Sequence, residues 1–340
     1  MPNVVTFGEI MLRLAPQGYL RFLQEPEFQA TFGGGEANVA VSLANYGIST
    51  AFVTALPKND IGEAAIRTLR YHGVDTSYIS RSGQRVGIYY LEKGASQRPS
   101  KVIYDRAHSS IAEAAREEFD WERIFEGAEW FHFTGITPAL GDSAAAICLD
   151  AVRAAKEKGV TVSCDLNYRK NLWTTEKASQ VMGELMKYVD VCIANEEDAE
   201  KVFGIKAGNT SVEAGTLDKA GYVDVAKQLK DRFGLRYVAI TLRTSLSASD
   251  NRWAAMLYNG TEDLLSREYT MHIVDRVGGG DSFAGGLIYG LMTGKTERDA
   301  LEFAVAASCL KHSVEGDFNL VNVKEVEALA QGDGSGRVKR

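Results

Sequence analysis

The chain has 340 residues, of which 45% are hydrophobic and 24% are charged, and its formal net charge is −7. This composition is typical of a globular protein with a full core, and the absence of any Lys/Arg block argues against a nucleic-acid-binding protein. No apolar run approaches the length of a membrane span. The four scattered cysteines form neither a CxxC pair nor a zinc pattern with the five histidines. We therefore expect reduced cysteines, no secretory signal and a cytoplasmic location.

Segments with the patterns of strands and helices alternate along most of the chain, which predicts a parallel sheet with helices on both faces. Strands are expected at residues 4–8, 51–56, 129–133, 160–166, 189–194 and 237–242. Helices are expected at residues 36–46, 61–71, 142–158, 178–187, 196–203, 222–232, 281–292, 297–311 and 323–330. The polar residues 206–221 predict a loop, and Asn259-Gly260 predicts a hairpin turn. We expect one α/β domain over residues 1–331 and a flexible tail at residues 332–340.

Two segments break the alternation, residues 12–32 and 87–106, where short strands with polar turns are predicted. Residues 87–93 and 101–105 would pair as a hairpin across a polar turn around residues 96–99. We expect these pieces to form a small β-sheet that stands off the main sheet as a lid.

The most informative stretch is VDRVGGGDSFAGGLIYG at residues 274–290, which runs from an apolar strand through three glycines into a predicted helix. Gly278, Gly279 and Gly280 would leave a turn with free backbone N–H groups at the positive end of that helix, which is a site for an anion. Asp281 would then be either the N-cap of the helix or a base beside a phosphate that is transferred. The stretch alone favours neither interpretation.

A second glycine loop, TFGGGEAN at residues 31–38, also precedes a predicted helix. One interpretation is a tight turn with Glu36 in the first helical turn, where acidic residues are favourable. The other is a site where a small polar ligand approaches the backbone of Gly34 and Gly35, with Asn38 as donor and acceptor. Asn38 lies on an otherwise apolar helix, and this favours the ligand site.

Polar side chains also gather where two predicted strands end. The first cluster holds Asp165, Asn167 and Arg169, and the second holds Asn195, Glu196 and Asp198. In an open α/β sheet, ligands bind at the carboxyl ends of the strands. A solvated loop explains either cluster alone, but two such clusters at strand ends favour a ligand site.

Aromatic residues and an arginine meet on the predicted hairpin. Tyr104 and Arg106 end one strand, and Tyr89 and Tyr90 lie on the facing strand. Arg106 suits bidentate capture of a carboxylate or a phosphate. A surface hairpin with aromatic cross-strand pairs explains these residues equally well.

These motifs in this order resemble the ribokinase-like, or PfkB, family of carbohydrate kinases, and the resemblance covers residues 4 to about 330. It is carried by GGGEAN at residues 33–38 and DRVGGGDSFAGG at residues 275–286. The resemblance implies a three-layer α/β sandwich with a central, mostly parallel sheet and a small β-sheet lid over the sugar site. It also implies phosphoryl transfer from ATP with Mg²⁺, in which Asp281 deprotonates the sugar hydroxyl and the turn of Gly278, Gly279 and Gly280 is the anion hole.

The same resemblance assigns most of the other site residues, whereas Thr241 and Arg243 are assigned from their place at a strand end. The sugar would lie against Gly34, Gly35, Asn38, Tyr89, Tyr90, Tyr104, Arg106, Arg169 and Asp281. The nucleotide would lie against Asn167, Asn195, Thr241, Arg243, Gly278 and Gly280, and Asp198 would act on Mg²⁺ through water. The sequence departs from the family pattern at Asp198, where Glu is usual, and at Arg276 and Gly279, where Thr and Ala are common. It departs again in TLRTSLS at residues 241–247, where the family usually has Gly-x-Gly near the nucleotide.

Within the family the sequence is most similar to the 2-keto-3-deoxygluconate kinases, through GIYYLEKG, the Y-D-R ending at Arg106 and the D-x-N-Y-R ending at Arg169. The implied reaction converts ATP and 2-dehydro-3-deoxy-D-gluconate to the 6-phosphate and ADP, and the two arginines could hold the carboxylate. Fructokinases share D-x-N-x-R-x-x-L-W, so a fructokinase or another neutral-sugar kinase stays the alternative. A non-catalytic sugar sensor of the same fold is a distant one, because a sensor needs no base.

The resemblance also bears on partners. We expect a small-molecule sugar or sugar acid as substrate and neither a nucleic-acid nor a membrane partner. We also expect a homo-oligomer, because the lid sheets of this family often pair between subunits.

Overall fold

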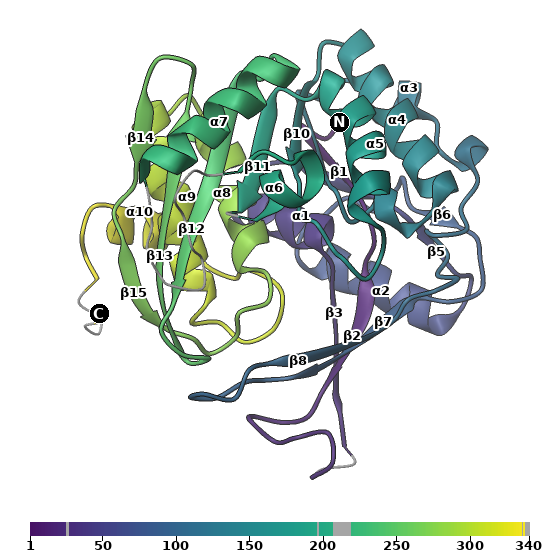
Figure 1. The fold of residues 1–340 in the computed structure, drawn as a ribbon. Coiled ribbons are helices and arrows are strands. Elements are labelled where there is room, and N and C mark those ends of the chain that lie inside the picture. Colours follow the sequence, from purple (N-terminus) through teal and green to yellow (C-terminus); the bar gives the residue numbers. More distant parts are fainter. Residues whose placement is uncertain (25–26, 196, 207–218, 335, 337–340) are drawn as a thin grey trace.

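The computed structural model describes residues 1–24, 27–195, 197–206, 219–334 and 336. Within these residues a nine-stranded sheet runs through the centre of the molecule in the order β14-β13-β12-β11-β10-β9-β1-β4, and β15 pairs with β13 (Figure 1). Neighbouring strands from β4 to β12 are parallel, whereas β13 pairs antiparallel with β12, β14 and β15. The strands are β1 (Val4–Phe7), β4 (Thr50–Val53), β9 (Trp130–Thr134), β10 (Thr161–Asp165), β11 (Val191–Asn195), β12 (Tyr237–Ser245), β13 (Asp250–Tyr258), β14 (Asp263–Leu265) and β15 (Tyr269–His272).

Helices cover both faces of this sheet because successive strand residues point to opposite sides. Val4 packs with one set of helices and Val5 with the other. One layer contains α3 (Trp121–Ile124), α4 (Asp142–Glu157), α5 (Thr175–Leu185), α6 (Asp198–Phe203) and α7 (Lys219–Phe233). The other contains α1 (Gly35–Asn45), α8 (Gly279–Met292) and α9 (Glu297–Lys311), with α2 (Asp60–Tyr71) beside α1 and α10 (Val323–Ala330) on α9. Short 3₁₀ turns lie at Arg116–Glu118, Pro138–Leu140 and Met186–Tyr188.

The predicted lid is a separate four-stranded sheet that extends from the body at the bottom of Figure 1. Its strand order is β3 (Gln29–Gly33), β2 (Met11–Ala15), β7 (Gly87–Glu92) and β8 (Lys101–Asp105). The predicted hairpin forms, with Tyr89 of β7 opposite Tyr104 of β8. The three-layer fold and the lid are therefore confirmed.

Several predicted boundaries were wrong. The strand expected at residues 51–56 is two strands, because β5 (Ala55–Leu56) leaves the main sheet to pair with β6 (Ser80–Arg81). Helix α5 begins earlier than predicted, because Thr174 caps it by accepting a hydrogen bond from the Lys177 N–H. In the loop predicted at 206–221, residues 207–218 lie outside the described part of the chain, and α7 has begun at Lys219. The predicted tail also lies partly outside the described residues.

Two broader expectations can be compared with the described residues. No helix in that part of the chain is long and apolar enough to cross a membrane. All four cysteines have free thiols: Cys148, Cys164 and Cys192 are buried and Cys309 is partly buried. The prediction of reduced core cysteines is thus confirmed for three of them.

Candidate active site

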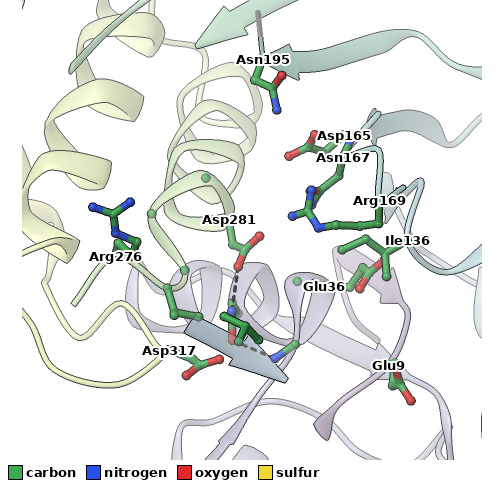
Figure 2. Close-up of a pocket in the computed structure, with 18 of the residues that line it drawn as sticks. Glu9, Glu36, Ile136, Asp165, Asn167, Arg169, Asn195, Arg276, Asp281 and Asp317 are labelled. Atoms are coloured by element: carbon green, nitrogen blue, oxygen red, sulfur yellow. Dashed lines mark hydrogen bonds between the residues drawn. The ribbon is translucent and has the colours of Figure 1, made fainter. Parts of the chain in front are cut away.

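A cleft of about 380 Å³ opens between the lid, the carboxyl ends of the central strands and the start of α8. This is the edge of an open α/β sheet where ligands bind. Of the predicted site residues, Glu196 lies outside the described residues, and Tyr90 and Asp198 do not line the cleft. The others line it: Gly34, Gly35, Asn38, Tyr89, Tyr104, Arg106, Asp165, Asn167, Arg169, Asn195, Thr241, Arg243, Gly278, Gly279, Gly280 and Asp281. Segments that are far apart in the sequence therefore share one cavity (Figure 2).

In the glycine turn at the start of α8, two glycines are tightly packed and the third faces open space. Gly278 has φ +82°, and a Cβ atom there would lie 2.0 Å from the Asp317 carbonyl oxygen. A Cβ atom on Gly279 would lie 2.4 Å from His312 Cε1, whereas one on Gly280 would meet no atom within 4 Å. The first two glycines are needed for packing, and the third leaves space beside the N–H groups of the first helical turn. Those N–H groups have no acceptor within the helix, so the turn suits an anion.

Asp281 is not the N-cap of this helix, because α8 begins at Gly279 and Asp281 lies in its first turn. Its Oδ2 accepts a hydrogen bond of 2.7 Å from Asn38 Nδ2 (Figure 2). Burial raises the pKa of Asp281 from the usual 3.8 to about 6, and the bond from Asn38 partly opposes this rise. At neutral pH the group is mostly a carboxylate whose pKa lies near the ambient pH, which suits a general base. Asn38 also accepts from the Gly34 N–H at 3.2 Å, so the two glycine loops are joined.

Glu36 lies in the first turn of α1, as Asp281 does in α8, but its carboxylate accepts several hydrogen bonds. Its Oε1 accepts hydrogen bonds from the Thr134 N–H and from the hydroxyls of Thr134 and Thr137, at 3.0, 2.8 and 2.7 Å. The residue is 2% exposed, and burial raises its pKa to about 7. Glu36 thus ties the start of α1 to the end of β9, which is where the cleft lies.

The polar cluster of Asp165, Asn167 and Arg169, at the end of β10, lines the cleft opposite the glycine turn. Asn167 has φ +38°, and its N–H donates to Asp165 Oδ1 at 3.1 Å. Burial, reinforced by the charges of Asp198 and Asp281, holds the pKa of Asp165 well above its usual range. Arg169 Nη1 donates to the Tyr168 carbonyl at 3.0 Å. Figure 2 shows the Arg169 guanidinium directed across the cleft towards Asp281.

Asp198 does not line the cleft with the others. It is 3% exposed, its Oδ1 accepts from the Tyr168 N–H at 3.0 Å, and its Oδ2 accepts from the Asn195 N–H at 3.1 Å. The carboxylate therefore holds together the two polar loops that follow β10 and β11. The two backbone donors occupy both oxygens, which is why Asp198 faces into the protein.

The lid is connected to the glycine turn by buried charges that the sequence did not reveal. Arg13 of β2 donates from Nη2 to Asp275 Oδ2 at 2.5 Å and from Nη1 to Asp317 Oδ1 at 2.8 Å. The Tyr89 hydroxyl donates to Asp317 Oδ2 at 2.6 Å. Because Asp275 lies only three residues before Gly278, this network links the position of the lid to the start of α8.

Arg106 lines the cleft but is already engaged. Its Nε donates to Glu9 Oε2 at 2.8 Å, its Nη2 contacts the same oxygen, and its guanidinium lies 5.4 Å from the Tyr104 ring centre. Ser109 donates to the other Glu9 oxygen at 2.6 Å. The ion pair is buried, with Arg106 9% exposed. Glu9 thus fixes the guanidinium at the edge of the cleft.

The prediction that Tyr90 contacts the sugar disagrees with its position. Side chains alternate along a strand, so Tyr90 points away from the face that carries Tyr89. Its ring packs against Phe28 at 6.0 Å, and it does not line the cleft.

Sequence reasoning also missed several lining residues. They are Glu9, Met11, Glu36, Val102, Ile136, Ile193, Ala194, Trp253, Arg276, Val277 and Asp317. Apolar members such as Ile136 look like any core residue in sequence. Glu9 had a detectable signal, because it is an acidic residue directly after an apolar strand.

Comparisons with known proteins show the family of the chain. The profile described as pfkB family carbohydrate kinase matches residues 1–322. The chain therefore belongs to the pfkB family of carbohydrate kinases, enzymes that transfer phosphate to a sugar.

Individual relatives are similar over their whole length. The crystal structure of 2-dehydro-3-deoxygluconokinase from Thermotoga maritima is 54% identical, with a TM-score of 0.94, over 98% of this chain and 100% of that chain. A PfkB family carbohydrate kinase from Listeria grayi is 34% identical, with a TM-score of 0.89, over 96% and 99%. A 2-dehydro-3-deoxygalactonokinase from Haloferax volcanii is 32% identical over 334 residues, 98% of each chain. The predicted family is confirmed.

Proposed function

We propose that the protein transfers the γ-phosphate of ATP to the 6-hydroxyl of 2-dehydro-3-deoxy-D-gluconate. The observation that carries this proposal is the pairing, in one cleft, of a base beside an anion-binding helix start with an arginine opposite it (Figure 2). A sugar acid has a hydroxyl at one end and a carboxylate at the other, so it fits between Asp281 and Arg169. The similarity to the Thermotoga maritima kinase supports this substrate.

In the proposed mechanism Asp281 accepts the proton of the 6-hydroxyl, and the oxygen attacks the γ-phosphorus as the bond to the β-phosphate oxygen breaks. ADP leaves with that electron pair. The N–H groups around Gly278, Gly279 and Gly280 would stabilise the charge on the transferred phosphoryl group, which is the main contribution a protein makes to this reaction. Asn38 orients the base through its hydrogen bond to Asp281.

Mg²⁺ would accompany ATP and neutralise charge on its phosphates. Among the described residues there is no group of three or more His, Cys, Asp or Glu side chains that could hold a metal ion. This fits Mg²⁺ that is bound mainly by phosphates and water rather than by a protein cage. Asp165 lines the cleft, and Asp198 lies behind it as the residue proposed to act through water.

Arg106 and Arg169 differ in how free they are to bind the carboxylate of the substrate. Arg106 is held by Glu9, whereas the one side-chain hydrogen bond of Arg169 within the described residues goes to a backbone carbonyl. We therefore propose that Arg169 makes the principal contact and that Arg106 adds a donor from a fixed position. An Arg fork matches a carboxylate in a bidentate geometry, which favours acid substrates over neutral sugars.

The substrate is tested by comparing ATP turnover on 2-dehydro-3-deoxy-D-gluconate, on its galactonate epimer and on fructose. We expect kcat/KM to be highest for the gluconate compound. A preference for fructose would establish the alternative, a neutral-sugar kinase. A preference for the galactonate compound would leave the proposed phosphoryl transfer intact and make the galactonate epimer the substrate, as the name of the Haloferax volcanii relative indicates for that protein.

The carboxylate anchor is tested with Arg169→Ala and Arg106→Ala. We expect KM for the sugar acid to rise by roughly 10- to 100-fold in Arg169→Ala, since a charge-assisted hydrogen bond contributes about 1.5–3 kcal/mol. Arg106→Ala should raise it less. Arg153→Ala is the matched control, because Arg153 is exposed on α4 and contacts Tyr188. An unchanged KM in Arg169→Ala would contradict the assignment.

We also propose a homo-oligomer that pairs through the lid, in a cytoplasmic protein. All five residues of β8 are exposed, and its Val102, Ile103 and Tyr104 are 40%, 44% and 44% exposed. Such an apolar edge strand favours pairing with another chain. Light scattering of the purified protein tests the assembly, and a monomer would refute it. The free cysteines support a reducing compartment.

A further inference from the structure

Two further arginines border the cleft, near enough to each other for their charges to interact. Arg243 lies on β12 opposite Trp253 of β13, whose side chain lines the same cleft. Arg276 lies in the loop that leads into the glycine turn, two residues before Gly278. Figure 2 shows Arg276 on the side of Asp281 opposite Arg169, so the two ends of the cleft carry separate cations.

Neither arginine forms a salt bridge with a carboxylate within the described residues. Arg276 makes one side-chain hydrogen bond there, from Nη2 to the Ala248 carbonyl at 3.0 Å, and among the same residues Arg243 makes no ion pair. Asp275, the acid beside Arg276 in sequence, is engaged by Arg13. Most of the guanidinium N–H donors of both residues are thus available to a ligand.

The electrostatics of this end also favour an anion. Burial and the nearby charge of Arg243 lower the pKa of Arg276. His312 lies behind the turn, and burial lowers its pKa to about 4, so it adds no charge at neutral pH. Two like charges held in one wall are unfavourable until an anion binds between them.

We propose that Arg243 and Arg276 bind the α- and β-phosphates of the nucleotide. The inference rests on the proposed function, in which ATP is the phosphate donor. The glycine turn would hold the γ-phosphoryl group, and the two guanidinium groups would hold the ADP part beside it. When the bond between the γ-phosphorus and the β-phosphate oxygen breaks, that oxygen keeps the electron pair, and the arginines stabilise the added charge.

The test measures nucleotide binding without sugar, by calorimetry of ADP and AMP with Arg243→Gln, Arg276→Gln and the double variant. We expect each single variant to lose ADP affinity by roughly tenfold or more and the double variant to lose more than either. AMP affinity should fall less, because AMP lacks the β-phosphate. In turnover, KM for ATP should rise while KM for the sugar acid stays unchanged. Arg252→Gln is the control, since Arg252 is exposed on β13 outside the cleft and should bind ADP like the wild type.

The possible results separate this inference from the proposed function. If the wild type phosphorylates the sugar acid and both variants keep wild-type ADP affinity, the inference is wrong and the proposed function stands. If the wild type binds no adenine nucleotide, the proposed function itself is wrong. Arg276→Gln also loses its bond to Ala248, so Arg276→Lys distinguishes charge from packing: restored ADP affinity supports phosphate binding, and no recovery contradicts it for Arg276. Within the described part of the chain Arg243→Gln removes no side-chain hydrogen bond, so this variant tests the site independently.

Discussion

Helices α1 and α8 begin in the same way and serve different purposes. Each follows a glycine loop, has a glycine N-cap without a side-chain cap, and carries an acid in its first turn, Glu36 in α1 and Asp281 in α8. Glu36 accepts three hydrogen bonds from β9 and the turn after it, whereas Asp281 accepts one, from Asn38. The partners supplied by the rest of the fold therefore decide which carboxyl group is structural and which is free to react.

The largest effect is expected from removing the charge of Asp281 while keeping its shape. Asp281→Asn should lower kcat by roughly 10²- to 10⁴-fold, because a positioned general base contributes that much. Its melting temperature should stay at or above that of the wild type, since a buried charge is removed. Glu36→Gln is the matched control and should retain most of the turnover. Retained activity in Asp281→Asn would show that another group takes the proton.

The glycine turn offers a pair of alanine variants that separates packing from ligand space. Gly280→Ala should fold as well as the wild type but lose most activity, because the methyl group enters the open space beside the N–H groups. Gly279→Ala should lower the free energy of unfolding by about 1–3 kcal/mol, because its Cβ would overlap His312. Chemical denaturation and kcat/KM measure the two effects. Full activity in Gly280→Ala would mean that no phosphate approaches there.

The buried acid of α1 should appear in the pH dependence of stability. Glu36 has a pKa of about 7 in the folded protein against the usual 4.5, so the folded state binds a proton that the unfolded state has released. Its contribution is complete below pH 4.5 and is lost as the pH rises through 7. The loss is on the order of 3 kcal/mol, at about 1.4 kcal/mol per pKa unit. Denaturation from pH 5 to 8 should show a shallower decline in Glu36→Gln, and an equal decline would contradict this origin.

The smallest effect concerns the bond between the two loops. Asn38 lowers the pKa of Asp281, so Asn38→Ala should raise it. The acid limb of the kcat/KM profile, where activity falls as Asp281 is protonated, should move up by about one pH unit. Asn45→Ala at the other end of α1, where Asn45 bonds the Asn319 carbonyl, is the control. An unmoved limb would show that the bond does not tune the base.

Much of the fold could be predicted because its signals are local. Apolar runs between helical patterns predict a parallel sheet, and both glycine loops were recognised before helices. The starting point of α8 was missed by two residues because Gly279 and Gly280 carry no helical signal, yet they occupy its first turn. The apolar strand expected to run into the glycine turn is β15, which ends at His272, two residues before Val274. Strand β5 separates from β4 because its partner β6 lies in a distant segment.

The sequence by itself determined the glycine turn before α8, the acidic residue that follows it and the lid hairpin, because each depends on neighbouring residues and on the fixed geometry of glycine, helix start and strand alternation. Only the tertiary structure decided how these parts are connected. It joined Arg106 to Glu9 and Arg13 to Asp317, pairs of residues that are far apart in the chain. It also turned Tyr90 away from the cleft and placed Arg243 and Arg276 along one wall. The physical reason is that charge pairing and burial depend on which segments the sheet topology brings together, and no local pattern contains that information.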